Sequence, residues 1–415
     1  MITYEKKRLD NGLTIVVNQD RQSKLAAVNL LYKVGARNED PSRTGFAHLF
    51  EHLMFRGTSR VPDFDTPVQM ACGETNAFTN NDYTDFYITL PKDNIETALW
   101  LESDRMTGLS LTPEAIETEK QVVIEEFRQR YLNQPYGDQM MLLRSLCYRE
   151  HPYRWATIGL TPEHIERATL EEVEHFYRRY YRPSNAILSI SGDFPVEEMM
   201  ALGEKWFSGI EEERDLVEDQ IPTEPEQLEA RRLVVEREVP ATSMMIAFPM
   251  GDRLSSDFYL GDLLSDLLAG GDSARLYDRL VRERRLFASV NAYISGSLDR
   301  GLFILTGQLF PSTTEQEAEQ ALLEEALRLA NPAEITAYEM EKVKNKFEAN
   351  TLFGELNVMN KAMNLGFYEM IGDLALINRE VALYRAITPE QVADFCRRTI
   401  RPEKSSTLIY RAKSC

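Results

Sequence analysis

The sequence predicts an α+β protein with two homologous domains, each a largely antiparallel sheet packed with helices. Three observations support this fold class. The chain has 415 residues, more than one domain usually holds. An acidic, turn-rich segment divides the chain into two parts of similar length. The order of strand-like and helix-like patterns before that segment is repeated after it.

The boundary lies at residues 212–230, where acidic residues and prolines leave few apolar side chains for a core. We therefore expect an N-terminal domain over residues 1–211, a linker over 212–230 and a C-terminal domain over 231–415. Because both domains repeat one order of patterns, we interpret them as diverged copies of a single unit.

In the first copy, apolar runs typical of strands occur at residues 13–17 and 26–32, and a helix is expected from about residue 44. Another helix is expected over residues 113–131, because Thr112 followed by proline is typical of a helix start. We expect the last two helices of the chain to close the second domain. The matching strands and helices of the second copy are expected at residues 233–236 and 243–248, from about 257, and at 332–350, 360–372 and 389–399.

The chain is acidic, with 47 Lys and Arg residues against 66 Asp and Glu residues and a formal net charge of −19. This balance argues against a nucleic-acid-binding protein, which needs cationic side chains facing phosphates. It suits a surface that favours solubility, or else a site for cationic ligands.

No run of about 20 apolar residues predicts a transmembrane helix, and the first residues lack the apolar core of a signal peptide. The cysteines have no paired spacing, which predicts free thiols in a reducing compartment rather than disulfides or a zinc knuckle. We therefore expect a cytoplasmic protein. The four cysteines are Cys72, Cys147, Cys396 and Cys415.

The clearest candidates for chemistry are His48 and His52, with Glu51 between them. Their spacing places both imidazoles on one helix face, one turn apart, where both can ligate a zinc ion at about 2.0–2.1 Å. A carboxylate beside such a metal, but not bound to it, can accept a proton from water. A solvated helix face is the alternative, but the apolar, aromatic surroundings of these histidines favour a metal.

A catalytic zinc ion needs a third protein ligand and an open position. On the helix expected at residues 113–131, Glu119 and Glu126 share one face. Glu126 can therefore reach the metal, while Glu119 supports a ligating histidine from two turns earlier. Acidic side chains on helices usually face solvent, so the spacing alone leaves both interpretations open.

Residues 48–52 read His-Leu-Phe-Glu-His, the inverted zinc motif His-x-x-Glu-His. Together with Glu126 and the segments 74–79, 270–276 and 360–363, this motif resembles the pitrilysin-type metallopeptidases. That family contains insulin-degrading enzyme and mitochondrial processing peptidase. The length resembles its short, two-domain branch, whose subunits pair into a closed chamber, as in the beta subunit of the processing peptidase and in bacterial heterodimeric zinc peptidases.

The resemblance implies a zinc metalloendopeptidase in which His48, His52 and Glu126 ligate Zn²⁺. Glu51 would then activate water, and Glu119 would be the acid that supports the site. These roles come from positions that match the family motif.

The resemblance also implies a place for substrate. Asn76, Ala77 and Phe78 match the segment that forms an edge strand beside the zinc, where a peptide would add as a further strand. Phe55 matches an aromatic residue that lines the pocket. Ordinary core packing explains Phe55 and Phe78 equally well.

The second copy departs from the first at the positions aligned with the zinc motif. Asp262, Ser265 and Asp266 stand in place of the two histidines and the glutamate. We therefore expect no catalytic zinc in the C-terminal domain.

A further departure bears on assembly. Family members that work alone carry an Arg and a Tyr, seven residues apart, that stabilise the oxyanion. Here Val281 and Ala288 occupy those positions, and a shift by one residue gives Arg282 and Ser289 instead. Losing one oxyanion donor costs about 10²–10³ in turnover. We therefore expect a heterodimer in which a homologous subunit supplies the pair, because a homodimer would lack it.

The expected function is hydrolysis of unfolded peptides inside a chamber formed by subunit pairing. A non-catalytic structural subunit is the alternative from another class, as is a peptide-binding subunit that keeps zinc for its structure.

Overall fold

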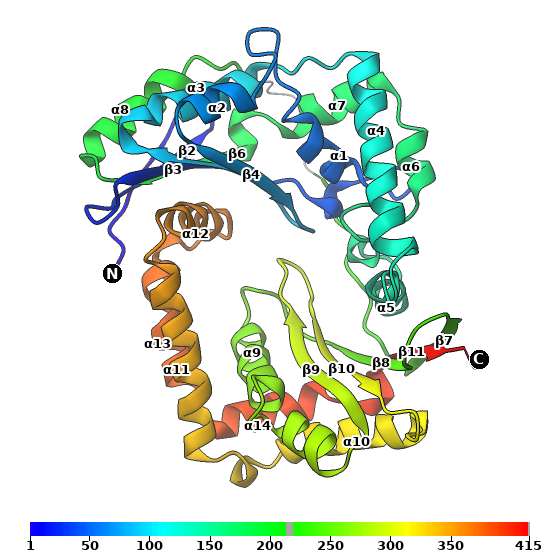
Figure 1. Ribbon diagram of the computed structural model, residues 1–415. Coiled ribbons are helices and arrows are strands. Elements are labelled where there is room, and N and C mark those ends of the chain that lie inside the picture. The colour runs from blue at the N-terminus through cyan, green and yellow to red at the C-terminus, as the bar shows by residue number, and fades with distance from the viewer. Residues whose placement is uncertain (213–218, 414–415) are drawn as a thin grey trace. The chain divides into compact units, whose positions relative to one another are not determined.

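The computed structural model describes residues 1–212 and 219–413, so residues 213–218 of the expected linker lie outside it. The chain forms two compact units, which Figure 1 shows with their helices and strands. Each unit contains a segment from the part of the chain expected to form the other domain. The first unit comprises Met1–Arg128, Trp155–Ile221 and Thr351–Arg379, and the second comprises Gln129–Arg154, Pro222–Asn350 and Glu380–Cys415. The two compact units therefore do not correspond to a single division of the chain near residues 212–230.

The sheet of the first unit has six strands, and all neighbouring pairs except β2–β6 are antiparallel. Strand β3 is buried along nearly its whole length, because helices cover both faces of the sheet and leave no polar face to alternate with the apolar one. In order across the sheet, the strands are β1 (Glu5–Arg8), β2 (Thr14–Gln19), β6 (Ala186–Gly192), β3 (Leu25–Tyr32), β5 (Thr84–Pro91) and β4 (Glu74–Thr79).

The sheet of the second unit repeats this arrangement without the first strand. Its single parallel pair, β7–β11, corresponds to β2–β6. In order, the strands are β7 (Arg231–Arg237), β11 (Ser406–Ala412), β8 (Ser243–Pro249), β10 (Leu302–Leu309) and β9 (Phe287–Ser295). The shared strand order confirms the predicted fold class of two homologous sheet-and-helix domains.

Helices cover both faces of the first sheet. Helices α3 and α8 lie on one face and α12 lies on the other (Figure 1). The helices of this unit are α1 (Phe46–Leu53), α2 (Asp65–Met70), α3 (Ile95–Thr107), α4 (Pro113–Phe127), α6 (Pro162–Glu166), α7 (Leu170–Tyr180), α8 (Val196–Phe207) and α12 (Val358–Met370).

Helix α12 corresponds to the helix expected at residues 360–372, but the expectation that it closes the second domain is wrong. It packs against β3 and β6 of the first unit, burying Ala362 and Leu365. Lys361 fixes this position through an ion pair with the buried Asp20, at 2.7 Å between Nζ and Oδ2.

In the second unit, α9 and α14 pack against each other, and α9 also contacts β9. The helix expected at residues 389–399 has the predicted bounds, whereas the one expected from residue 332 begins at Ala337 after a short 3₁₀ turn. The remaining helices are α5 (Gln139–Cys147), α9 (Ser256–Ala269), α10 (Glu315–Arg328), α11 (Ala337–Gly354), α13 (Glu380–Ala386) and α14 (Pro389–Thr399).

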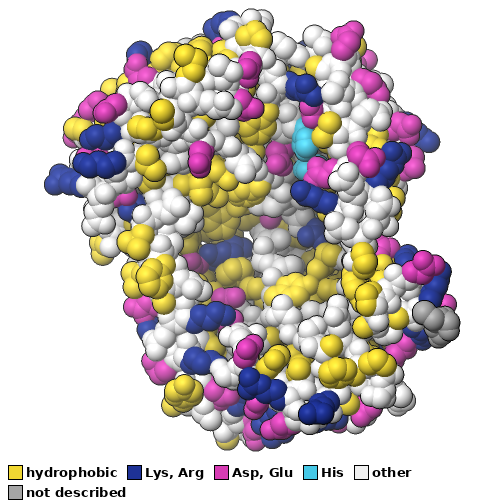
Figure 2. Space-filling model, viewed as in Figure 1, with side chains coloured by type: hydrophobic (Ala, Val, Ile, Leu, Met, Phe, Trp, Pro, Cys, Tyr) yellow, Lys and Arg dark blue, Asp and Glu magenta, His cyan; other side chains and the backbone are white. Residues whose placement is uncertain are grey.

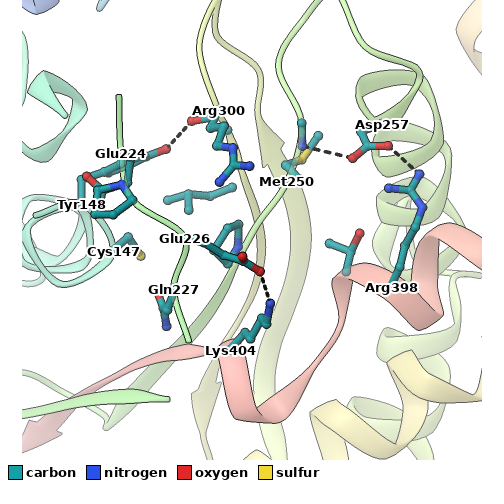
Figure 3. A pocket seen from close by; sticks show the side chains of 16 residues that line it. Cys147, Tyr148, Glu224, Glu226, Gln227, Met250, Asp257, Arg300, Arg398 and Lys404 are labelled. Carbon is teal, nitrogen blue, oxygen red and sulfur yellow. Dashed lines mark hydrogen bonds and ion pairs between the residues drawn. The ribbon is translucent and has the colours of Figure 1, made fainter. Parts of the chain in front are cut away.

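Residues 224–227 of the expected linker are held by contacts within the second unit. The carboxylate of Glu224 accepts hydrogen bonds of 2.9–3.0 Å from the three backbone N–H groups of residues 149–151. Glu226 forms an ion pair with Lys404, and Gln227 is buried. This segment borders a cavity of about 270 Å³ (Figure 3). The carboxylates of Glu224 and Glu226 are therefore both paired.

Among the described residues, no helix combines the length and the apolar character needed to cross a membrane. Cys72, Cys147 and Cys396 are free thiols, and Cys415 lies outside the described residues.

Candidate metal centre

Helix α1 begins at a backbone position that requires glycine. Gly45 has φ +94°, and a Cβ atom there would lie 2.6 Å from the carbonyl oxygen of Ile158. The expected apolar face of the helix is buried, at Phe46, Leu49, Phe50 and Leu53. This burial fixes the rotation of α1, so the directions of His48, Glu51 and His52 are set by the core beneath them.

The buried carboxyl group of Glu39, whose pKa is raised to about 8 by burial, holds the first turn of α1. Glu39 accepts hydrogen bonds from the backbone N–H groups of Gly45 and Ala47, both at 2.9 Å. An acceptor at this end satisfies N–H groups that have no partner within the helix and also interacts favourably with the helix dipole.

Helix α4 begins as the sequence indicates. The Thr112 side chain accepts a hydrogen bond of 3.2 Å from the backbone N–H of Ala115, and Pro113 is the first helical residue. Glu119 and Glu126 are two turns apart and both face α1, as their ion-pair distances to its histidines show.

The three predicted metal ligands converge. His48 Nε2 lies 3.8 Å from Glu126 Oε1, and His52 Nε2 lies 3.4 Å from Glu126 Oε2. One ligand atom from each of the three residues lies within 4.8 Å of the others. Atoms bound tetrahedrally to one zinc ion at 2.0–2.2 Å would lie about 3.4 Å apart. Two imidazoles and a carboxylate at this spacing fit a zinc ion.

The surroundings of these ligands favour a cation that solvent can reach. The side chains of His52 and Glu126 are 24% and 17% exposed. Figure 2 shows histidine surface next to acidic side chains on the face that it presents. Burial lowers the pKa of His52, but hydrogen bonds to Glu119 and Glu126 outweigh it and raise that pKa to about 9. The negative potential behind this shift also attracts a divalent ion.

Glu119 lies where its predicted supporting role requires. Its Oε2 is 3.3 Å from His52 Nδ1, and its Oε1 accepts a hydrogen bond from Arg56 Nε. Burial raises the pKa of Glu119, but these two donors outweigh it and hold the pKa below its usual value. The carboxylate is therefore a charged acceptor for the Nδ1–H of His52, which leaves Nε2 for the metal.

Glu51 is half-buried on α1, between the two histidines. Burial raises its pKa, and hydrogen bonds from Thr79 partly offset that effect. The structure thus places a carboxyl group next to the ligand cluster and connects it to β4.

The residues predicted to bind substrate lie on the outermost strand of the first sheet. Asn76, Ala77 and Phe78 belong to β4, which pairs with β5 on one side and lies beside α1. Among the described residues, no strand pairs with its other side. Asn76 also lines a cavity of about 530 Å³ in the first unit. Binding of a peptide along this edge stays a prediction.

Phe55 and Phe78 both have aromatic neighbours. The Phe55 ring lies 5.8 Å from Phe64 and 6.1 Å from Phe86, measured between centroids, and the Phe78 ring lies 5.7 Å from Tyr83. Both side chains are partly exposed. They therefore contribute to the packing of the first unit, and their contact with substrate stays a prediction.

In the second unit, internal partners occupy the positions that correspond to the zinc motif. Asp262 Oδ2 accepts a hydrogen bond of 2.7 Å from the Tyr384 hydroxyl, and Asp266 forms an ion pair of 2.7 Å with Lys346. The only metal-competent cluster among the described residues is that of His48, His52 and Glu126. The ammonium group of Lys346 is thus the partner of Asp266 in this copy.

The positions aligned with the oxyanion pair lie in the second unit. Val281 is partly buried against the core, and Arg282 lies 3.7 Å from Asp278 on its own segment. Ala288 and Ser289 belong to β9. None of these four side chains carries the phenol group of the tyrosine expected in family members that work alone.

Two residues that hold the site were missed from the sequence. Arg56 follows His52 by four residues, a spacing that could have indicated a shared helix face. Glu39 lies six residues before Gly45, outside the spacing of a local helix cap, so its position in the sequence does not indicate that contact.

Comparisons with known proteins match both halves of the chain to models of one peptidase family. Residues 14–159 match the family described as "Insulinase (Peptidase family M16)", and residues 167–347 match "Peptidase M16 inactive domain". "Zinc protease PqqE" of Helicobacter pylori is 32% identical over 349 residues, covering 82% of this chain and 78% of the relative. "Uncharacterized zinc protease YmxG" of Bacillus subtilis is 23% identical, covering 96% of each chain.

A solved structure extends the similarity to the whole fold. The crystal structure of a protease from Helicobacter pylori superposes with a TM-score of 0.93 at 27% identity, covering 99% of this chain and 100% of that one. The extent of this match and the family matches in both halves lead to one assignment. The chain belongs to peptidase family M16, the pitrilysin-type metallopeptidases.

Proposed function

We propose that this chain is a zinc-dependent endopeptidase that hydrolyses unfolded peptides. The observation that carries the proposal is the convergence of His48, His52 and Glu126 from two helices, with Glu51 beside them. The similarity to proteins named zinc proteases supports the same activity.

In this proposal, His48, His52 and Glu126 hold the zinc ion. A bound zinc ion supplies Lewis acidity and can lower the pKa of water to about 7. Glu51 accepts the proton of the attacking water and passes it to the leaving amine. Glu119 keeps the His52 ring in the tautomer that leaves its Nε2 free for the metal.

The open edge of β4 is the proposed place for the peptide. A peptide in extended conformation adds to such an edge through main-chain hydrogen bonds, which bind many different sequences. This mode suits unfolded peptides, because their main-chain N–H and C=O groups are not already paired within a fold. Asn76, Ala77 and Phe78 would contact the peptide, with Phe55 nearby.

We also propose that the active form is a heterodimer enclosing a chamber. The partner would be a homologous subunit with the Arg and Tyr that Val281 and Ala288 replace here. The free thiols support a reducing compartment, so we propose a cytoplasmic location.

The test of this function is Glu51→Gln, which keeps the size of the side chain but cannot accept the proton. We expect peptide cleavage by the chain, mixed with its partner, to fall by about 10²–10⁴ while zinc content and folding stay unchanged. Glu125→Gln, on the exposed part of α4, is the matched control and should cleave normally. Cleavage that persists in Glu51→Gln would show that the base is wrong. Zinc binding without cleavage in the wild-type pair would favour a structural or peptide-binding subunit.

A further inference from the structure

Arg56 lies one turn beyond His52, where the chain continues the helical path of α1. Its backbone N–H donates to the carbonyl of Leu53 at 3.0 Å. The guanidinium Nε donates to Glu119 Oε1, although the Arg56 side chain is 40% exposed and Glu119 only 9%. A partly exposed side chain thus ends on a buried acid.

The two oxygens of Glu119 have separate partners. Oε1 faces Arg56 Nε, and Oε2 lies 3.3 Å from His52 Nδ1. A carboxylate that has a partner at each oxygen cannot rotate freely about the Cγ–Cδ bond of its side chain. Glu119 therefore presents one fixed acceptor to His52, and the other nitrogen of that ring, Nε2, is 3.4 Å from Glu126.

We propose that Arg56 is a positioning residue of the metal centre. It fixes Glu119, Glu119 fixes the ring plane and tautomer of His52, and His52 then presents Nε2 to the ion. This inference rests on the proposed metal centre and assigns a role to a residue outside the zinc motif.

Two effects of removing Arg56 have opposite signs. Loss of its positive charge would make the centre more negative and would tighten cation binding. Loss of its hydrogen bond would free Glu119 and weaken binding, and partners of ligating histidines typically contribute 10–100-fold to metal affinity. An exposed charge is screened by water and salt, so we expect the positional effect to dominate.

The test compares Arg56→Ala, Arg56→Lys and Arg60→Ala in the full chain by zinc affinity under chelator competition. We expect Arg56→Ala to bind zinc about tenfold more weakly and to release it faster. Arg56→Lys keeps the charge and one donor, so it should recover part of the affinity. Arg60, which pairs with Asp104 at 2.6 Å and is 65% exposed, is the matched control and should behave as wild type.

The spectrum of the cobalt-substituted protein gives a second readout, because its visible bands report the arrangement of ligands around the ion. We expect those bands to shift in Arg56→Ala and not in Arg60→Ala.

Zinc affinity in Arg56→Ala that equals or exceeds that of wild type would overturn the proposal. If Arg56→Ala fails to fold, Arg56→Lys decides, since an affinity identical to wild type with an unshifted spectrum would also overturn it. Absence of zinc binding in the wild-type chain would instead reject the metal centre itself.

Discussion

Asp85 is an acidic side chain in the interior of the first unit, on β5 and 1% exposed. Its Oδ1 accepts a hydrogen bond from the amide of Asn29. Burial raises the pKa of Asp85 well above its usual value, Asn29 lowers it in part, and the buried Glu102 raises it further. Burial raises the pKa of the nearby Tyr83, and the charge of Asp85 raises it further. The folded protein therefore favours the neutral form of Asp85.

This shift predicts a pH dependence of stability. Above about pH 4, Asp85 is ionised in the unfolded chain, whereas the folded chain keeps its proton. The folded state then binds more protons, so the free energy of unfolding falls as pH rises, by up to about 1.4 kcal/mol per pH unit from this group. Asp85→Asn, which is always neutral, should show a smaller fall between pH 5 and 8 in urea unfolding. Equal slopes for the two proteins would contradict this account.

At the residue scale, the sequence predicts groups whose spacing repeats with the helix. His48 and His52 lie four residues apart and Glu119 and Glu126 seven apart, so each pair must share a helix face, and the structure brings the faces together. Asp85 could not be predicted in this way. It lies in a strand whose pattern gives no sign that a carboxyl group enters the core, and its partner Asn29 is 56 residues away.

At the element scale, α1 depends on a contact that its own sequence does not contain. The helix has eight residues, too few to be stable alone, so tertiary contacts hold it. Its apolar face supplies most of them, and Glu39 supplies the cap at the first turn. The histidines are thus positioned by both the core and the cap.

Glu39→Gln tests this dependence. Above the raised pKa of Glu39, about 8, both carboxylate oxygens accept hydrogen bonds from backbone N–H groups, whereas the amide of Glu39→Gln would place its NH₂ group against one of these donors. One hydrogen bond is then lost and a buried donor is left unsatisfied. We expect the free energy of unfolding to fall by about 1–3 kcal/mol and zinc binding to weaken with it. Urea unfolding and chelator competition measure the two effects. Asp40→Asn, at the exposed neighbouring acid, is the control. A Glu39→Gln protein as stable as the control would show that the cap is unimportant.

The expected linker has contacts that its amino-acid composition does not predict. Its prolines and acids predict a segment without a core. Composition cannot show that the Glu224 carboxylate accepts hydrogen bonds from three consecutive backbone N–H groups at residues 149–151, since that site exists only once the second unit has folded.

At the scale of the whole molecule, the repeat in the sequence predicts the repeated strand order, because equivalent patterns fold into equivalent sheets. The exchange of segments between the units was not predictable. The pattern of α12 shows that one face is apolar, but it does not show which of two sheets that face will cover. Contacts such as Lys361 with Asp20 decide this, and they join residues 341 positions apart.

The proposed pairing with a second subunit gives a prediction at this scale. The isolated chain should bind zinc but cleave peptides poorly, since each missing oxyanion donor typically costs about 10²–10³ in turnover. Addition of the homologous partner should restore cleavage, and a partner without its own Arg and Tyr should not. Cleavage rates of the two chains, alone and mixed, make this measurement. Full activity of the isolated chain would contradict the need for a partner.

The central claim is that two imidazoles of α1 and one carboxylate of α4 bind a single ion. Zinc content after equilibrium dialysis tests it most directly in three proteins: wild type, Glu126→Gln and Glu125→Gln. We predict one zinc ion per chain for wild type and for Glu125→Gln, and at least a tenfold weaker affinity for Glu126→Gln, which loses a charged ligand. Equal zinc binding by Glu126→Gln and wild type would contradict the claim.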